Sequence, residues 1–155
     1  MADTVKLDGL KELDAKLAKM PAKLGFKALR SAMMLTSKPM FLAAKAKAES
    51  TGIRGRDAGA TAAAMGRWTR KITPTSTVLM LGPKNKNAKA LALYNAMHGG
   101  DVQRLNHFHL LEFGSINGGA QPFLRPAFES TKLQFAYSFG KNLAATIEKV
   151  ARSAA

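Results

Sequence analysis

The residues with the most obvious chemical potential are two histidines and a glutamate that lie close together. His107 and His109 are two positions apart, and Glu112 follows. On a helix, side chains two positions apart point about 200° away from each other, so these imidazoles would share a metal ion only on a strand. The sequence has no cysteine and no further histidine nearby. We therefore predict no metal site and interpret these histidines as partly buried or interfacial side chains beside Phe108.

Acid–base, nucleophilic and phosphate-binding chemistry also lack a recognisable set of residues. After residue 101 the only acids are Glu112, Glu129 and Glu148, and nothing marks a nucleophile with its base. The stretch GIRGRDAG, residues 52–59, lacks the Gly-Lys-Ser/Thr ending of a phosphate-binding loop. We find no helix-turn-helix, zinc-finger or RNA-binding signature. The sequence therefore predicts a protein that is not an enzyme, with no catalytic residues, cofactor or metal.

The composition is that of a soluble globular protein with small apolar side chains. Hydrophobic residues make up 46% of the chain but aromatic residues only 7%, and much of the apolar content is alanine. We expect a single domain spanning residues 1–155, with a thin core that is completed against neighbouring subunits. No segment approaches the ~18 consecutive apolar residues of a membrane span. The absence of cysteine fits folding in a reducing cytoplasm.

The charge balance is strongly basic, with 24 Lys and Arg against 10 Asp and Glu and a net charge of +14. No acid lies between Asp14 and Glu49, where basic residues are frequent. This asymmetry indicates a polyanion or an acidic protein as partner, although a solvated basic surface would give the same composition. The candidate contacts to DNA or to an acidic partner are Lys23, Lys27, Arg30, Arg54, Arg56, Lys84 and Lys86.

Apolar periodicity predicts helices in the N-terminal third of the chain. A short amphipathic helix runs from the N-cap Asp8 to Pro21, and a second stripe predicts a long helix from about residue 21 to about residue 48. Pro39 lies inside that stripe and should kink or break the helix near residues 36–38. Residues 49–66 are rich in glycine and alanine and are predicted to form an exposed loop.

The rest of the chain predicts a hairpin followed by helices. RWTRKI and TVLMLG, separated by the turn signal TPTS, predict two strands over residues 67–82. We expect a short helix over residues 88–97, a break at residues 99–100, a short helix or strand over 105–113, and a last helix from Pro126 to near the C-terminus. The fold class is α+β, with long N-terminal and C-terminal helices packed on a small antiparallel β-sheet.

Two motifs, HFHLLEFGS at residues 107–115 and AQPFLRPAFES at residues 120–130, carry a family resemblance. Together with the N-terminal helix, the proline-containing long helix and the strand ending in VLMLGP, they resemble the small tail-completion, or head–tail connector, family of lambdoid long-tailed bacteriophages. The resemblance covers nearly the whole chain. The sequence departs from the family pattern in a longer region after Thr51-Gly52 and in a helical insertion between Lys84 and Arg104.

The resemblance implies a structural virion protein of the phage neck, assembled in the cytoplasm of the bacterial host. It implies a homo-oligomeric ring, most simply a hexamer, at the head-proximal end of the tail, where it helps to join tail and filled head. Its neighbours would be neck and tail proteins such as the tail terminator and the head-closure or adaptor protein, with sequence-independent contact to packaged DNA and no contact with a membrane. The alternative function is that of a basic nucleic-acid-binding protein without sequence specificity.

The two motifs are interpreted as a docking device. Glycines at 114, 118 and 119 permit a sharp chain reversal, and Phe123 and Arg125 are residue types favoured as interface anchors. Glu112 could pair with Arg125 in the same or an adjacent subunit. Alternatively, Phe123 and Leu124 cap the core at the start of the last helix. The predicted interface residues are Glu112, Phe113, Gly114, Gln121, Pro122, Phe123, Arg125 and Pro126.

Overall fold

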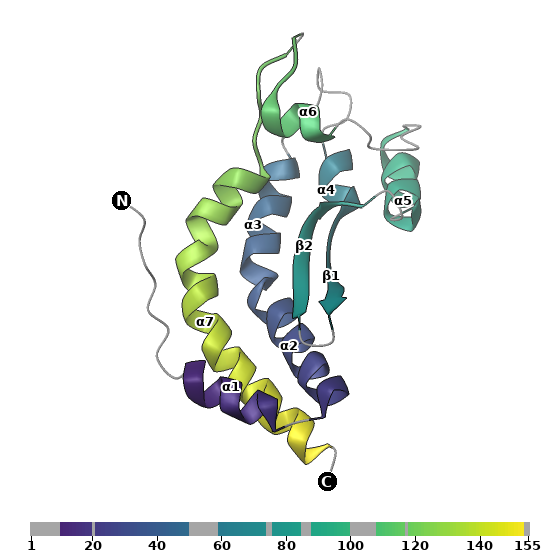
Figure 1. Cartoon of the computed structure of the whole chain (residues 1–155). Helices are drawn as coiled ribbons and strands as arrows, with labels where there is room; N and C mark the ends of the chain where they lie inside the picture. Colours follow the sequence, from purple (N-terminus) through teal and green to yellow (C-terminus); the bar gives the residue numbers. More distant parts are fainter. Residues whose placement is uncertain are drawn as a thin grey trace, which may run out of the picture. The chain divides into compact units, whose positions relative to one another are not determined.

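The computed structural model of the protein describes residues 10–19, 21–49, 59–73, 76–84, 88–99, 108–116 and 118–153 (Figure 1). The fold is α+β, with a two-stranded antiparallel sheet and a long C-terminal helix, as the sequence predicted. The elements in chain order are α1 (Leu10–Ala18), α2 (Ala22–Thr36), α3 (Lys38–Glu49), α4 (Ala60–Ala64), β1 (Met65–Thr73), β2 (Ser76–Pro83), α5 (Ala88–His98), α6 (Phe108–Phe113) and α7 (Leu124–Arg152).

The predicted break in the long N-terminal helix is confirmed at Ser37, which separates α2 from α3. The Ser37 backbone N–H donates to the carbonyl oxygen of Met33 at 3.0 Å, and its hydroxyl donates to that of Met34 at 3.3 Å. Pro39 is the second residue of α3, where a backbone N–H would have no intrahelical acceptor. The proline therefore starts a new helix instead of distorting the old one.

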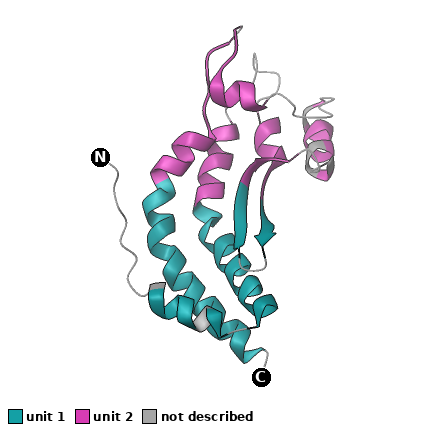
Figure 2. Ribbon diagram, in the orientation of Figure 1, with its two compact units in different colours: residues 1–39, 68–80, 131–155 teal, residues 40–67, 81–130 magenta. Residues whose placement is uncertain are grey.

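The residues cluster into two compact units that are each discontinuous in sequence (Figure 2). Unit 1 consists of residues 1–39, 68–80 and 131–155, and unit 2 of residues 40–67 and 81–130. Helix α7 and both strands contribute residues to each unit. The single-domain organisation expected from chain length stays a prediction.

The core of unit 1 is formed by helices α1, α2 and α7. Ala28 and Ala32 of α2 pack with Leu143, Ile147 and Val150 of α7, and partly buried side chains of all three helices surround this cluster. A buried polar link lies beside this core. The Thr36 hydroxyl donates to the carbonyl oxygen of Ala32 at 2.8 Å and accepts from Nδ2 of Asn142 at 2.9 Å.

The core of unit 2 joins α3, α4, α6 and the first turn of α7. The buried members are Ala44, Ala48, Ala62, Met65, Leu111, Phe123 and Ala127. Helix α5 packs on the other side of α4, where Tyr94 covers Ala60 and Ala64. Alanine supplies four of the seven buried members of this cluster in unit 2 and two of the five buried members of the unit 1 cluster. The expectation of an exposed loop over residues 49–66 is wrong for Glu49, which ends α3, for residues 60–64, which form the largely buried helix α4, and for residues 65–66, which begin β1. Residues 50–58 of the predicted loop lie outside the described residues.

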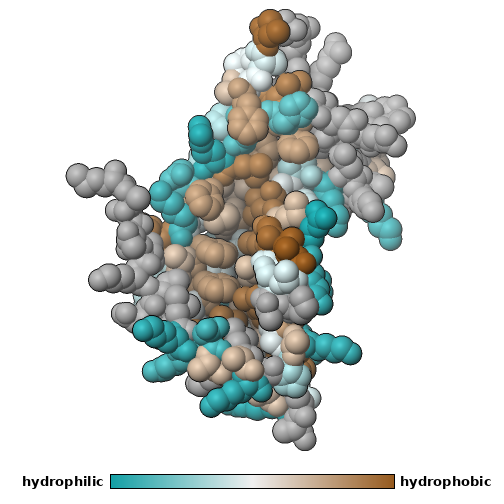
Figure 3. Space-filling view, viewed as in Figure 1, coloured by the Kyte–Doolittle hydropathy of each residue, from teal (hydrophilic) through white to brown (hydrophobic). Residues whose placement is uncertain are grey.

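Large apolar side chains remain exposed on both units. Unit 1 exposes Leu35, Leu133 and Tyr137, and unit 2 exposes Leu42, Phe113, Ile116 and Phe128. Figure 3 shows apolar side chains, in brown, exposed on the face on view beside hydrophilic ones. Across the described ranges, no helix is both long enough and apolar enough to cross a membrane.

Candidate functional site

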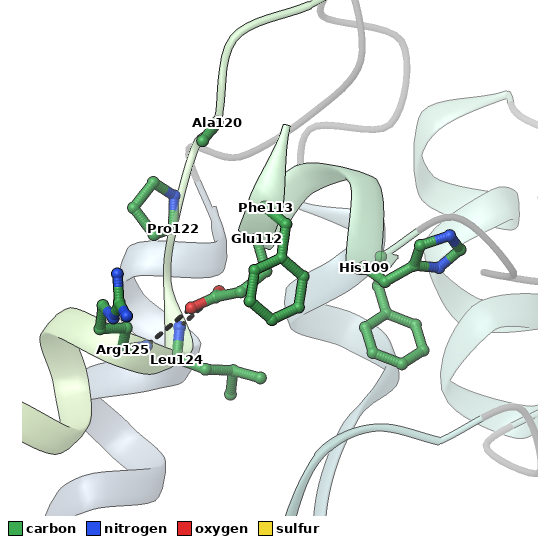
Figure 4. Close-up of a pocket in the computed structure, with 8 residues that line it drawn as sticks. His109, Glu112, Phe113, Ala120, Pro122, Leu124 and Arg125 are labelled. Atoms are coloured by element: carbon green, nitrogen blue, oxygen red, sulfur yellow. Dashed lines mark hydrogen bonds between the residues drawn. The ribbon is translucent and has the colours of Figure 1, made fainter. Parts of the chain in front are cut away.

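The two motifs of the sequence meet at the start of α7, where Glu112 of α6 caps the helix. Its Oε2 accepts the backbone N–H groups of Phe123 and Leu124, both at 2.9 Å, and its Oε1 accepts that of Arg125 at 2.8 Å (Figure 4). The first N–H groups of a helix have no intrahelical acceptor, and a negative charge there also interacts favourably with the helix dipole. Glu112 therefore fixes α6 to the first turn of α7.

The predicted ion pair between Glu112 and Arg125, both described in the structure, is not formed within the chain, and the alternative pair between adjacent subunits stays a prediction. Both carboxylate oxygens already accept backbone N–H groups, and Arg125 reaches Glu112 only through its own N–H. The guanidinium group of Arg125 is exposed and does not reach the carboxylate (Figure 4). A surface cation thus remains at the start of α7.

Phe123 is a core residue, so its prediction as a surface anchor is corrected. Its side chain is 0% exposed and packs with Leu111 and Ala127, while Leu124 lies partly buried against the same cluster. The alternative considered from the sequence, that Phe123 and Leu124 cap the core, describes the structure correctly. The aromatic ring at position 123 is not available to a partner.

The predicted chain reversal between the motifs depends on Gly114. Its φ angle is +85°, and a Cβ atom there would lie 3.1 Å from the backbone nitrogen of Ala120. The returning segment is held to α6 by the N–H of Gln121, which donates to the carbonyl oxygen of Leu111 at 2.7 Å. At Gly118 an added Cβ would meet only the Ser115 hydroxyl, at 3.7 Å, so a side chain fits there.

A pocket of about 450 Å³ lies beside this cap. Its walls are mainly apolar, and Phe113 on its rim is 81% exposed. His109 packs edge-on against Phe108, with ring centroids 6.1 Å apart, and His107 lies outside the described residues. Four predicted interface residues line the pocket, whereas Gly114, Gln121, Phe123 and Pro126 do not. The lining residues are Phe108, His109, Glu112, Phe113, Ala120, Pro122, Leu124 and Arg125.

The predicted basic contacts are only partly within the described structure. Lys23, Lys27 and Arg30 are exposed on α2, and Lys84 is half-buried after β2. The other three candidates, Arg54, Arg56 and Lys86, lie outside the described residues. No group of three acidic or histidine side chains that could hold a metal ion occurs in the part of the chain that the structure describes.

Sequence reasoning missed two cations on β1 that contact aromatic rings. The Arg67 guanidinium carbon lies 5.7 Å from the centroid of the Phe41 ring within unit 2. The Lys71 ammonium lies 5.3 Å from the centroid of the Phe26 ring within unit 1. The available signal was the alternation Arg67, Thr69, Lys71, which places both cations on the same face of a strand.

Comparisons of the chain with protein-family models, with curated proteins and with solved structures found no match. The family resemblance therefore depends on the two motifs and on the order of the elements around them.

Proposed function

We propose that this protein is a structural component of a bacteriophage neck, which forms a ring at the head-proximal end of the tail and helps to join tail and head. The observation that supports this most directly is the cap made by Glu112. The glutamate of one motif accepts the N–H groups of Phe123, Leu124 and Arg125 in the other. The two sequence features behind the resemblance thus form one structural element, as expected if they belong to one inherited device.

The geometry of this element favours docking over catalysis. The Glu112 carboxylate is occupied by three N–H donors, so its oxygens serve to position a helix. Beside it, the exposed Phe113 ring and the exposed Arg125 side chain border an apolar pocket. Aromatic residues and arginine are the types most enriched at the energetic centres of protein interfaces. We therefore assign Phe113 and Arg125 as the anchors of this docking site.

Apolar exposure beyond the pocket supports assembly into a homo-oligomer. Tyr137 is 81% exposed, and Leu42, Phe128 and Leu133 are each about half exposed. Large exposed apolar patches on a soluble protein commonly mark interaction surfaces. Sixfold symmetry comes from the family resemblance alone, and any other symmetry of this layer in a reconstruction of the neck would contradict the hexamer.

Arg125→Ala in the phage that encodes this chain tests the docking site. We expect the purified variant to keep its melting temperature, because an exposed arginine contributes little to the fold. Infected cells should then accumulate filled heads and separate tails. The matched control is Arg152→Ala, which removes an arginine whose side chain is 84% exposed. Normal joining by Arg125→Ala, with the chain present in the necks, would remove Arg125 from the docking site and contradict the proposal.

The second candidate function, sequence-independent nucleic-acid binding, is favoured by the net charge of +14. The two functions predict different assembly states of the purified protein in the absence of nucleic acid. Negative-stain images of nucleic-acid-free protein should contain ring-shaped particles if the neck proposal holds. Particles that form only when DNA is added would favour the second function.

A further inference from the structure

Four basic side chains gather around Phe26 in unit 1. Lys23, Lys27 and Arg30 are all exposed on α2, and helix geometry places them within about 60° of arc around the axis. Lys23 and Arg30 stand three positions before and four after Phe26, so they neighbour it on the helix surface, and Lys27 neighbours these two cations in turn. From β1, the ammonium group of Lys71 lies 5.3 Å from the centroid of that ring. The hairpin therefore adds a fourth cation to a helix face that already carries three.

The charge of this cluster, which we call the Phe26 cluster, is not balanced by acids on the two elements that carry it. Neither α2 nor β1 contains an acidic residue. Its four cations form no ion pair with any side chain in the described ranges of the protein. Like charges on neighbouring helical positions repel each other, so the cluster costs the isolated protein stability. An anionic partner that neutralises several of these charges at once would bind here favourably.

We infer that the Phe26 cluster binds the phosphate backbone of duplex DNA. Lys23 and Arg30 are about 10 Å apart along the helix axis. One strand of B-DNA carries about three phosphates over that length of its own axis. Phosphate contacts of this kind carry no sequence information, so the surface binds any duplex.

Two further observations favour duplex DNA over other anionic partners. Three of the four cations are lysines, which are depleted at protein–protein interfaces and act as point-charge binders of phosphate. The Phe26 ring is half-buried beneath Lys71 and is not presented for stacking on an unpaired base. An acidic protein and a single strand are therefore outcomes that the experiment must distinguish.

The inference deepens the proposed function, since a neck protein meets the packaged genome, but it depends only on residues of unit 1. It is tested with the full-length protein and a fluorescent 30-base-pair duplex in two unrelated sequences, by anisotropy between 50 and 200 mM salt. Loss of two phosphate contacts changes the slope of log K against log salt by about 1.8 and weakens binding at 100 mM salt on the order of 50-fold. We expect this change for the double variant Lys27→Gln, Lys71→Gln on both sequences.

The matched control is the double variant Lys141→Gln, Lys149→Gln, which removes two exposed lysines of α7 in the same unit. Equal loss of affinity in both variants would mean that only net charge matters and would overturn the inference. It would also be overturned by salt-independent binding, by preference for one sequence or for single strands, or by polyglutamate binding through Lys27 and Lys71 with no binding to DNA. Circular dichroism of each variant checks that the fold is retained.

The outcomes for this surface and for the neck proposal are separable. Duplex binding that needs Lys27 and Lys71, in a protein that never enters phage particles, would keep this inference and refute the neck proposal. A protein that builds normal necks but does not bind the duplex would refute this inference and keep the neck proposal.

Discussion

Replacing Glu112 with alanine should destabilise the protein, because one substitution removes the acceptor of three backbone N–H groups. Two of these groups, those of Phe123 and Leu124, are half-buried, whereas that of Arg125 is exposed. The exposed N–H can donate to water when the carboxylate is gone. The two half-buried groups are harder to rehydrate, and they carry most of the expected effect.

The size of the effect follows from these three contacts. A hydrogen bond to a charged group contributes about 1.5–3 kcal/mol, and an N-terminal cap contributes about 1 kcal/mol in an ordinary helix. Since two of the bonds are shielded from water, we expect Glu112→Ala to lower the free energy of unfolding by about 3 kcal/mol. For a chain of this length that corresponds to roughly 6–12 °C in melting temperature. Glu112→Gln keeps one acceptor oxygen but loses the charge, and should cost about half as much.

Thermal unfolding followed by circular dichroism measures this difference, and amide hydrogen exchange locates it. Exchange should accelerate at residues 123–125 in Glu112→Ala. The control is Glu148→Ala, which makes the same change in charge. Its exposed pair with Arg152, at 3.9 Å, should contribute less than about 0.5 kcal/mol. If the two variants melt within a degree of each other, with unchanged exchange at residues 123–125, Glu112 does not cap the helix.

Four other substitutions test the packing around this site and along α7, each by denaturant unfolding. Phe123→Ala should cost about 3–5 kcal/mol because the ring is fully buried, and a cost below about 1 kcal/mol would contradict its place in the core. Gly114→Ala should cost about 1–3 kcal/mol, since φ is +85° and the new Cβ would crowd Ala120, whereas Gly118→Ala should be nearly neutral. Gly140→Ala should stabilise α7 by up to about 1 kcal/mol, because the added Cβ meets nothing within 4 Å; destabilisation would refute this.

Elements that depend on local signals were predictable from the sequence. The turn signal between the strands and the apolar periodicity of the helices each involve residues a few positions apart, and Pro39 marks the break at Ser37. Helix α4 was missed, because the glycines that precede it favoured a loop, although Ala60, Ala62 and Ala64 are strong helix formers. Their burial under other elements decides the structure, and that burial depends on residues distant in sequence.

The sequence predicted which residues belong to the candidate site better than it predicted what each of them does. The motifs located Glu112, Phe113, Pro122 and Arg125, which all line one pocket. The usual capping rule looks at the residue just before a helix, which here is Phe123, so it cannot point to an acceptor eleven positions upstream. A local pattern also does not tell whether an aromatic residue before a helix is buried or exposed. The sequence was therefore compatible with Phe123 as a surface anchor and with Phe123 as a core residue.

The division of unit 1 into three segments has a consequence for how the protein is made. Its core joins α2 to the end of α7, and the hydrogen bond between Thr36 and Asn142 spans 106 positions. During synthesis, α1 and α2 leave the ribosome long before the residues that cover their apolar faces. Folding must bring these distant segments together, at a cost in chain entropy, before their packing stabilises the protein. We therefore expect folding to be slow for a protein with so much helix. A messenger RNA truncated before the codon for Leu143 would yield a chain that lacks the buried α7 residues of this core. Such a chain would be a substrate for chaperones and proteases.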